Sequence, residues 1–196
     1  MTDTNRLADL ARNFTHAVTI VAGVSPDQLG DPTPCPDYDV AALIDHLIGA
    51  SWLGVALSRG ESPAGGEFPH VELADAPDQL RRAGQAAEAA WSDDARLAAT
   101  VTMPWGQIWT GATLLELHVT ELAAHTWDLA VATGQLDRLD PGWLRALSKP
   151  PGRCSSPSTA TAQVIPTAPR SKRHPTLPTG SDLRCSWAVS LANSED

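Results

Sequence analysis

Apolar side chains recur at three- and four-residue intervals along several stretches of the chain, which is the spacing of one face of an α-helix. The first stretch runs from Asn5 to Val24, and a loop rich in proline and aspartate, SPDQLGDPTPCPD, follows it. The second begins after Asp39, a residue type that caps helix N-termini, and ends at the glycine near position 60. One histidine, His46, interrupts its apolar stripe, which consists of Val40, Leu43, Ile44, Leu47, Ile48, Leu53 and Leu57.

Two further helices and one interruption are predicted downstream. An alanine-rich stretch from Asp78 to Trp91 has a weaker apolar face. Residues 97–109, LAATVTMPWGQIW, alternate briefly and contain a proline and a glycine, which predicts an extended excursion or a short hairpin. The longest helix follows from about Thr110 to Thr133, with Gly134 in the C′ position. Four helices with mostly short links predict an all-α four-helix bundle with a short extended excursion before its last helix.

The periodic pattern stops near Ser148. The last 48 residues contain both lysines, two of the three cysteines and seven of the sixteen prolines, and they have no sustained period of 3.6 or 2. We therefore predict a bundle domain over residues 1–148 and an irregular tail over residues 149–196. DPGWLRAL starts a further helix that SKPPGRCSS breaks, so a shifted reading frame, a truncation and a divergent linker are alternative explanations of the tail.

Charge and composition narrow the classes of function. The net charge of −9 divides into −12 for residues 1–148 and +3 for the tail, so the body of the protein should repel nucleic acid. No apolar run approaches the roughly 18 residues of a membrane span, and the N-terminus MTDTNRLADL is polar, so we expect a cytoplasmic protein without a membrane partner. Cys35, Cys154 and Cys185 form no CxxC pair, which argues against a disulfide framework and a thiolate zinc site.

Glu121 and His125 lie four residues apart in the last predicted helix, so both side chains project from one face. The stripe expected to face the bundle interior consists of Leu115, His118, Leu122, His125 and Leu129. An unpaired carboxylate there would cost several kcal/mol. A divalent metal would satisfy both groups if a third ligand came from another helix, and His46 occupies an inward-facing stripe. His46, Glu121 and His125 would form the two-histidine, one-carboxylate set that leaves one coordination position open in catalytic zinc sites.

The spacing alone leaves other interpretations open. A glutamate and a histidine four residues apart are more often a solvated pair or a hydrogen-bonded pair within one helix. His46 alone is more often a core histidine with a satisfied ring. We do not count His118 as a ligand, since it could lie behind the ligands or be a solvated neighbour.

The sequence also predicts roles for four residues near the candidate ligands. Helix rotation turns Asp128 toward the side of His125 and Trp127 away from it, so we expect Asp128 to support that histidine and Trp127 to pack against another helix. Trp105 and Trp109, in the extended excursion, are candidates for a pocket wall.

Two stretches resemble a known family. TPCPDYDVAALIDHLIGA resembles the second-helix signature of actinobacterial DinB-like proteins of the mycothiol-dependent maleylpyruvate isomerase type, and LLELHVTELAAHTWDLAVATGQ is similar to their metal helix. Both signatures occur in order, and the resemblance covers about residues 5–140. It implies a DinB-like bundle whose metal, usually zinc, is held by His46, Glu121 and His125. It ends in the tail, where relatives continue with a further helix and an acidic end.

The resemblance also implies a function. We expect a metal-dependent enzyme that handles thiols, by S-transfer or thiol-assisted isomerisation, with mycothiol as co-substrate and a small electrophile as substrate. A coordinated thiol would be favoured as its thiolate. The alternatives are a metal- or small-molecule-binding bundle protein without turnover, and a structural bundle or homodimer module without metal.

Overall fold

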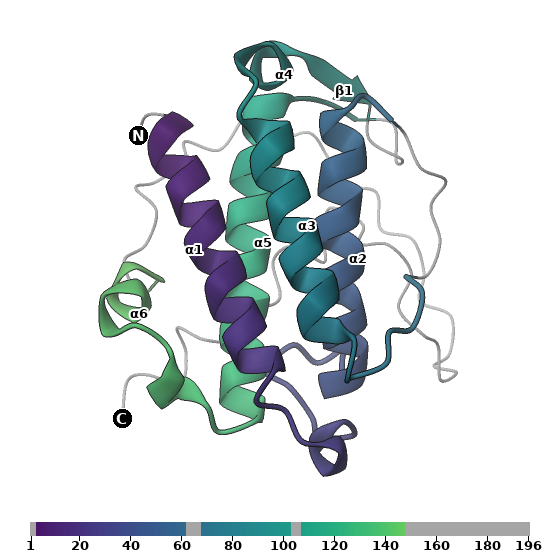
Figure 1. Ribbon diagram of the computed structural model, residues 1–196, viewed down its shortest axis with the longest axis vertical. Helices are drawn as coiled ribbons and strands as arrows, with labels where there is room; N and C mark the ends of the chain where they lie inside the picture. The colour runs from purple at the N-terminus through teal and green to yellow at the C-terminus, as the bar shows by residue number, and fades with distance from the viewer. Residues whose placement is uncertain (1–2, 62–67, 103–106, 148–196) are drawn as a thin grey trace, which may run out of the picture.

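The four predicted long helices form a bundle (Figure 1). This computed structural model describes residues 3–61, 68–102 and 107–147. α1 packs against α3 and α5, and α2 packs against the same two helices, so α1 and α2 occupy opposite corners. The all-α four-helix bundle expected from the sequence is confirmed, with helices α1 (Asp3–Val21), α2 (Val40–Ser58), α3 (Ala76–Trp91) and α5 (Gly111–Ala132).

Local signals in the sequence fix the ends of the two helices that carry the candidate ligands. The Asp39 carboxylate accepts a hydrogen bond from the backbone N–H of Ala42 at 2.8 Å, which caps α2 as predicted. At the C-terminus of α5, Gly134 has a φ of +69°, a left-handed conformation that glycine adopts without strain. The next residue, Gln135, then donates its N–H to the carbonyl of Ala130 at 2.7 Å, which closes the helix as a Schellman motif does.

The predicted excursion before α5 is a short antiparallel hairpin. Strand β1 (Thr100–Thr102) pairs with β2 (Ile108–Thr110), with Val101 opposite Trp109, and residues 103–106 lie outside the described part of the chain. The periodicity did not predict three short helical segments, because three to five residues are too few to show a helical pattern. These segments are η1 (Pro26–Gln28), α4 (Asp94–Ala98) and η2 (Leu136–Arg138). The remaining short helix is α6 (Pro141–Leu147), which DPGWLRAL was expected to start.

Within the described part of the chain, α2 is the one helix that meets the length and composition criteria for a membrane span. It is long and apolar enough to cross a membrane by length and composition alone, with a mean hydropathy of 1.7 over the tested window. It packs in the core against α3 and α5, and residues along its length, including Leu43, Leu47 and Val55, are nearly inaccessible. Half of the tested window is buried inside the bundle, and the core helix of a soluble protein passes the same composition test, so the apolar composition of α2 is weak evidence for a membrane span.

Helix α6 continues the chain beyond the bundle and docks on α1. The Trp143 indole N–H donates to Asn13 Oδ1 at 2.6 Å, and the Asn13 amide donates to the carbonyl of Val119 on α5 at 2.9 Å. The helix that DPGWLRAL was predicted to start is therefore present. The predicted domain boundary at 148, the tail over residues 149–196, and Cys154 and Cys185 lie outside the described residues.

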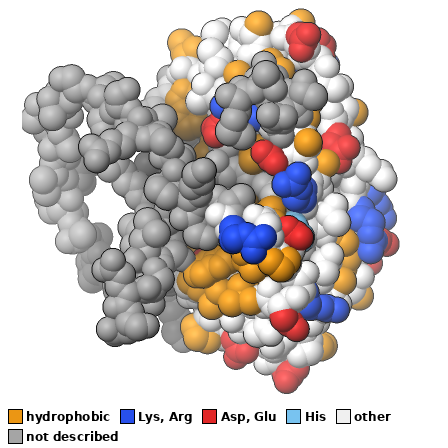
Figure 2. Space-filling view, turned by 90° about the vertical axis from the view of Figure 1, so that its left-hand side faces the viewer, with side chains coloured by type: hydrophobic (Ala, Val, Ile, Leu, Met, Phe, Trp, Pro, Cys, Tyr) orange, Lys and Arg blue, Asp and Glu red, His pale blue; other side chains and the backbone are white. Residues whose placement is uncertain are grey.

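The surface mixes charges with apolar side chains. On the face in Figure 2, hydrophobic side chains gather in one patch that basic and acidic side chains border. Among the large hydrophobic residues that the structure describes, Ile108 on the hairpin is the most exposed, at 69%.

Candidate metal centre

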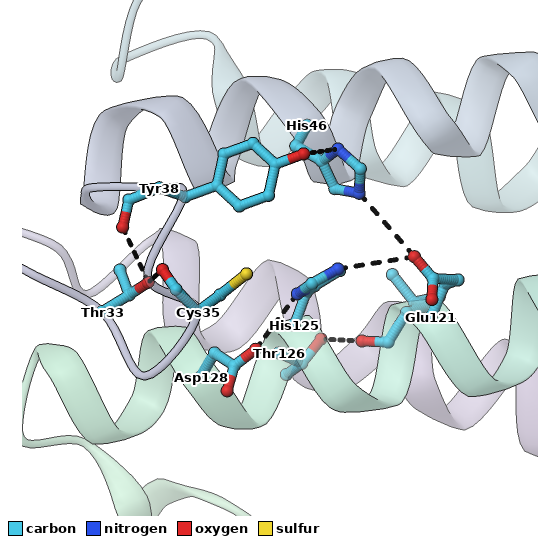
Figure 3. A network of polar contacts seen from close by, with 9 residues as sticks. Thr33, Cys35, Tyr38, His46, Glu121, His125, Thr126 and Asp128 are labelled. Atoms are coloured by element: carbon cyan, nitrogen blue, oxygen red, sulfur yellow. Dashed lines mark hydrogen bonds and ion pairs between the residues drawn. The ribbon is translucent and has the colours of Figure 1, made fainter. Parts of the chain in front are cut away.

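The three candidate ligands converge between α2 and α5. His46 comes from α2, and Glu121 and His125 come from consecutive turns of α5 (Figure 3). Glu121 Oε2 lies 3.8 Å from His46 Nε2 and 3.4 Å from His125 Nε2. One donor atom from each residue lies within 4.8 Å of the other two. The structure thus brings together the residues that the sequence singled out; their role as metal ligands stays a prediction.

These separations are close to those of a zinc site. Ligand atoms about 2.0–2.2 Å from a tetrahedral zinc lie roughly 3.4 Å from one another. The Glu121–His125 distance already has this value, the Glu121–His46 distance exceeds it by about 0.4 Å, and the widest separation in the set is 4.8 Å, so the His46 ring would have to move closer to the other two residues to share an ion with them. Two histidine nitrogens and one carboxylate oxygen are also the donor types that zinc uses in catalytic sites.

Both imidazole rings are held by their Nδ1 atoms. His125 Nδ1 lies 3.1 Å from the carboxylate of Asp128, and His46 Nδ1 lies 3.0 Å from the Tyr38 hydroxyl. Each ring therefore turns its Nε2 atom toward Glu121 (Figure 3). Hydrogen bonds to the far nitrogen are the usual way in which proteins fix the tautomer and orientation of a metal-binding histidine.

The local charges favour an ionised carboxylate. Burial raises the pKa of Glu121, but the imidazole rings of His125 and His46 beside the carboxylate outweigh burial and lower the pKa to about 2. Burial lowers the pKa of His125, but its hydrogen bonds to Asp128 and Glu121 outweigh burial and raise that pKa to about 9. The site accordingly pairs a carboxylate with a cation, and a divalent ion would provide the positive charge in place of the proton on His125.

His46 differs from His125 in charge. Burial is the main influence on its pKa and lowers it, so the ring is neutral near pH 7. Its Nε2 atom is buried and makes no hydrogen bond to any residue in the described ranges. A neutral imidazole with a buried nitrogen free of hydrogen bonds, aimed at a carboxylate, fits a metal ligand, since metal binding uses the lone pair of a neutral ring.

A cavity lies beside the three residues. It is small: the space that a water-sized molecule can occupy is about 10 Å³, within about 190 Å³ of empty space that includes open solvent. The ring of Phe68 covers His46 from the α2–α3 link, with ring centroids 5.7 Å apart, and it fits there because Gly49 has no Cβ to collide with it. The cavity is lined by His46, Leu47, Ala50, Ser51, His118, Glu121, Leu122 and His125.

His118 is a buried neighbour, which corrects the possibility that it is solvated. Its ring packs edge-on against Phe14, with centroids 5.6 Å apart, and a Cβ on Gly54 would lie only 2.7 Å from its Nδ1 atom. Neither ring nitrogen has a hydrogen-bond partner among the described residues. Burial lowers the pKa of His118 to about 4, so the ring is neutral at physiological pH.

The surrounding residues were predicted with mixed success. Asp128 supports His125 as expected, and Trp127 packs against the core. Trp109 does not line the cavity described above, so its place in a pocket wall stays a prediction, while Trp105 lies outside the described residues. Sequence reasoning missed Tyr38, because nothing in the pattern shows that the loop before α2 folds back over His46.

Comparison with known proteins identifies the family of the chain. The model of the mycothiol maleylpyruvate isomerase N-terminal domain matches residues 10–130, more than half of the chain. The chain belongs to this family. The family expected from the two sequence signatures is therefore confirmed, and residues 10–130 include all three candidate ligands of the metal centre.

Individual proteins are also similar to this member of the mycothiol maleylpyruvate isomerase family, in sequence or in fold. Uncharacterized proteins from two strains of Mycobacterium tuberculosis are 36% identical over 131 residues, which cover 62% of this chain. The match spans 64% of the length of those relatives, slightly less than two thirds. The crystal structure of the mycothiol-dependent maleylpyruvate isomerase superposes with a TM-score of 0.52 and covers 75% of this chain and 68% of that one. At 16% identity, this likeness shows the shared fold alone.

Proposed function

We propose that the protein is a metal-dependent enzyme that uses mycothiol for S-transfer to a small electrophile or for thiol-assisted isomerisation. The observation that carries the proposal is the convergence of His46, Glu121 and His125 beside a cavity between α2 and α5. Membership of a family named for mycothiol maleylpyruvate isomerase supports mycothiol as the thiol. The donor set of two imidazoles and one carboxylate supports zinc as the metal.

Residues of the chain itself would hold the metal ion and orient its ligands. His46, Glu121 and His125 would hold the ion, while Asp128 and Tyr38 fix the two rings with their Nε2 atoms inward. A bound zinc ion would supply a positive charge that favours the thiolate form of a coordinating thiol at neutral pH.

Apolar side chains form part of the cavity wall. Its lining includes the apolar side chains of Leu47, Ala50 and Leu122, which offer water no hydrogen bonds. A poorly hydrated wall strengthens electrostatic interactions within the site and favours the sulfur nucleophile over hydrolysis of the electrophile.

A turnover assay tests the proposal. Zinc-loaded protein is incubated with mycothiol and either maleylpyruvate or a bimane electrophile, and products are followed by chromatography and mass spectrometry. We expect isomerised acid or the mycothiol adduct to form faster than in the protein-free reaction. Glu121→Gln should abolish the acceleration, because it removes the anionic ligand. Glu116→Gln, an exposed carboxylate of the same helix, is the matched control and should keep it.

Two outcomes would favour the other functions. Zinc and mycothiol binding without turnover of any electrophile would contradict an enzyme and favour a binding protein. Purified protein that neither retains nor binds a divalent metal would contradict both and favour a structural bundle.

A further inference from the structure

Tyr38 reaches the metal centre from outside the two ligand-bearing helices. Its hydroxyl oxygen lies 3.0 Å from His46 Nδ1, and its ring lies against both histidine rings, with centroids 4.9 Å from His46 and 6.2 Å from His125. Figure 3 shows the tyrosine ring lying along α2, with its hydroxyl on the side of the His46 ring that faces away from Glu121.

The loop before α2 is folded tightly enough to hold this side chain in place. Thr33 Oγ1 lies 2.9 Å from the carbonyl oxygen of Cys35 and 2.8 Å from that of Tyr38. The Tyr38 N–H donates to the Cys35 carbonyl at 3.1 Å, and the N–H of Val40 donates to the carbonyl of Asp31 at 3.1 Å. Cys35 is itself buried, with 4% of its surface exposed, which anchors the loop to the bundle. The loop therefore presents Tyr38 to His46 in one fixed geometry.

We propose that Tyr38 is a positioning residue of the metal centre, whose hydroxyl oxygen accepts the Nδ1–H of His46 and so fixes Nε2 as the atom that binds the metal. The inference rests on the proposed function. A neutral imidazole carries one proton, and placing it on Nδ1 leaves the lone pair of Nε2 facing Glu121. Without a partner at Nδ1, the proton could move to Nε2, where it would block coordination.

The two histidines are then supported by different chemistry. Asp128 supports His125 with an anionic carboxylate, while Tyr38 supports His46 with a neutral hydroxyl. The neutral partner orients the ring without adding a second negative charge beside it. Both partners hold Nδ1, so the two supports are equivalent in geometry and differ in charge.

The test is the zinc affinity of Tyr38→Phe, measured by competition with a chromogenic chelator. The variant keeps the aromatic ring and its contacts and loses only the hydroxyl. Loss of such a supporting hydrogen bond typically weakens metal binding about 10–100-fold, and we expect an effect of that size. Thr126→Val is the matched control: it removes a buried hydroxyl one residue from His125 that bonds to the Leu122 carbonyl at 2.5 Å rather than to a ligand ring. Its zinc affinity should equal that of the wild type.

A spectroscopic readout separates positioning from folding. Tyr38 is the only tyrosine of the chain, so ¹³Cζ-labelled tyrosine gives a single NMR resonance. Zinc should shift this resonance in the wild-type protein, and it should not do so in His46→Ala. The ring ¹⁵N shifts of His46 in the zinc-loaded protein should report a protonated Nδ1.

The outcomes distinguish this inference from the proposed function. Wild-type protein that binds zinc no more tightly than Tyr38→Phe would overturn the positioning role and leave the metal site intact. Wild-type protein that binds no zinc would overturn both. A His46 ring protonated at Nε2 in the zinc-loaded protein would overturn the inference alone.

Discussion

The buried ring of His118 should make the fold sensitive to acid. Burial lowers its pKa to about 4, while the same side chain in the unfolded chain titrates at 6.5. The nearby negative charge of Glu121 raises the pKa slightly and does not offset burial. Because the folded pKa is the lower one, the unfolded chain binds the proton more readily, so stability is present above pH 6.5 and is lost as the pH falls toward 4.

The magnitude follows from these two pKa values. The full difference corresponds to about 3 kcal/mol of unfolding free energy, and about 2 kcal/mol of it is lost between roughly pH 7.5 and pH 5. Replacing His118 with leucine removes the titrating group and two buried nitrogens without hydrogen-bond partners among the described residues. We therefore expect His118→Leu to be at least as stable as the wild type near neutral pH and about 2 kcal/mol less sensitive to acid.

Urea unfolding of chelator-treated protein at the two pH values measures this effect. The difference between wild type and variant isolates His118, because the other histidines titrate in both proteins. His70→Ala is the control: His70 is exposed, and its hydrogen bond to Asp45 raises its pKa, so its removal should not reduce acid sensitivity. Equal loss of stability on acidification in wild type and His118→Leu would refute the assignment of a buried, neutral ring.

Three other predictions concern the site, its packing and the tail. Zinc binding near pH 7 should release about one proton per ion, because His125, with a pKa of about 9, must lose its proton. The affinity of the protein for zinc should fall about tenfold per unit of pH below 9. Calorimetry in buffers of different ionisation enthalpy would detect the released proton. Gly54→Ala should cost about 1–3 kcal/mol in urea unfolding, because its Cβ would press on His118, whereas Gly30→Ala, which meets nothing within 4 Å, should be nearly neutral. Removal of residues 149–196 should leave the melting temperature and zinc content nearly unchanged; a large loss of either would show that the tail belongs to the folded domain.

The long helices and their inward faces could be predicted because helical periodicity is a local property. Leu115, His118, Leu122, His125 and Leu129 repeat at three- and four-residue spacing, and all five are buried in the bundle. The same periodicity placed His46 on the inner face of α2, where it is 4% exposed. Two inward faces on helices that pack together bring their polar residues to one place, so much of the candidate site was already implied by the pattern.

Loop geometry explains what the sequence did not predict. Tyr38 meets His46 only because the loop over residues 31–39 folds on itself through bonds between its own backbone and Thr33. Phe68 covers the same histidine from a link with no periodic pattern. Loop placement also matters for Trp109, because its nearness in sequence to α5 did not reveal that the hairpin lies at one end of the bundle (Figure 1).

The most direct test of a metal-dependent, thiol-handling site is a titration of cobalt(II)-loaded protein with mycothiol, followed by absorption spectroscopy. Cobalt(II) takes the same ligands as zinc and absorbs strongly when a thiolate binds it. We predict that a thiolate-to-cobalt charge-transfer band grows to saturation at one mycothiol per cobalt, and that Glu121→Gln, which should not hold the ion, gives no band. Stoichiometric cobalt binding at His46, Glu121 and His125 with no charge-transfer band at any mycothiol concentration would contradict the account.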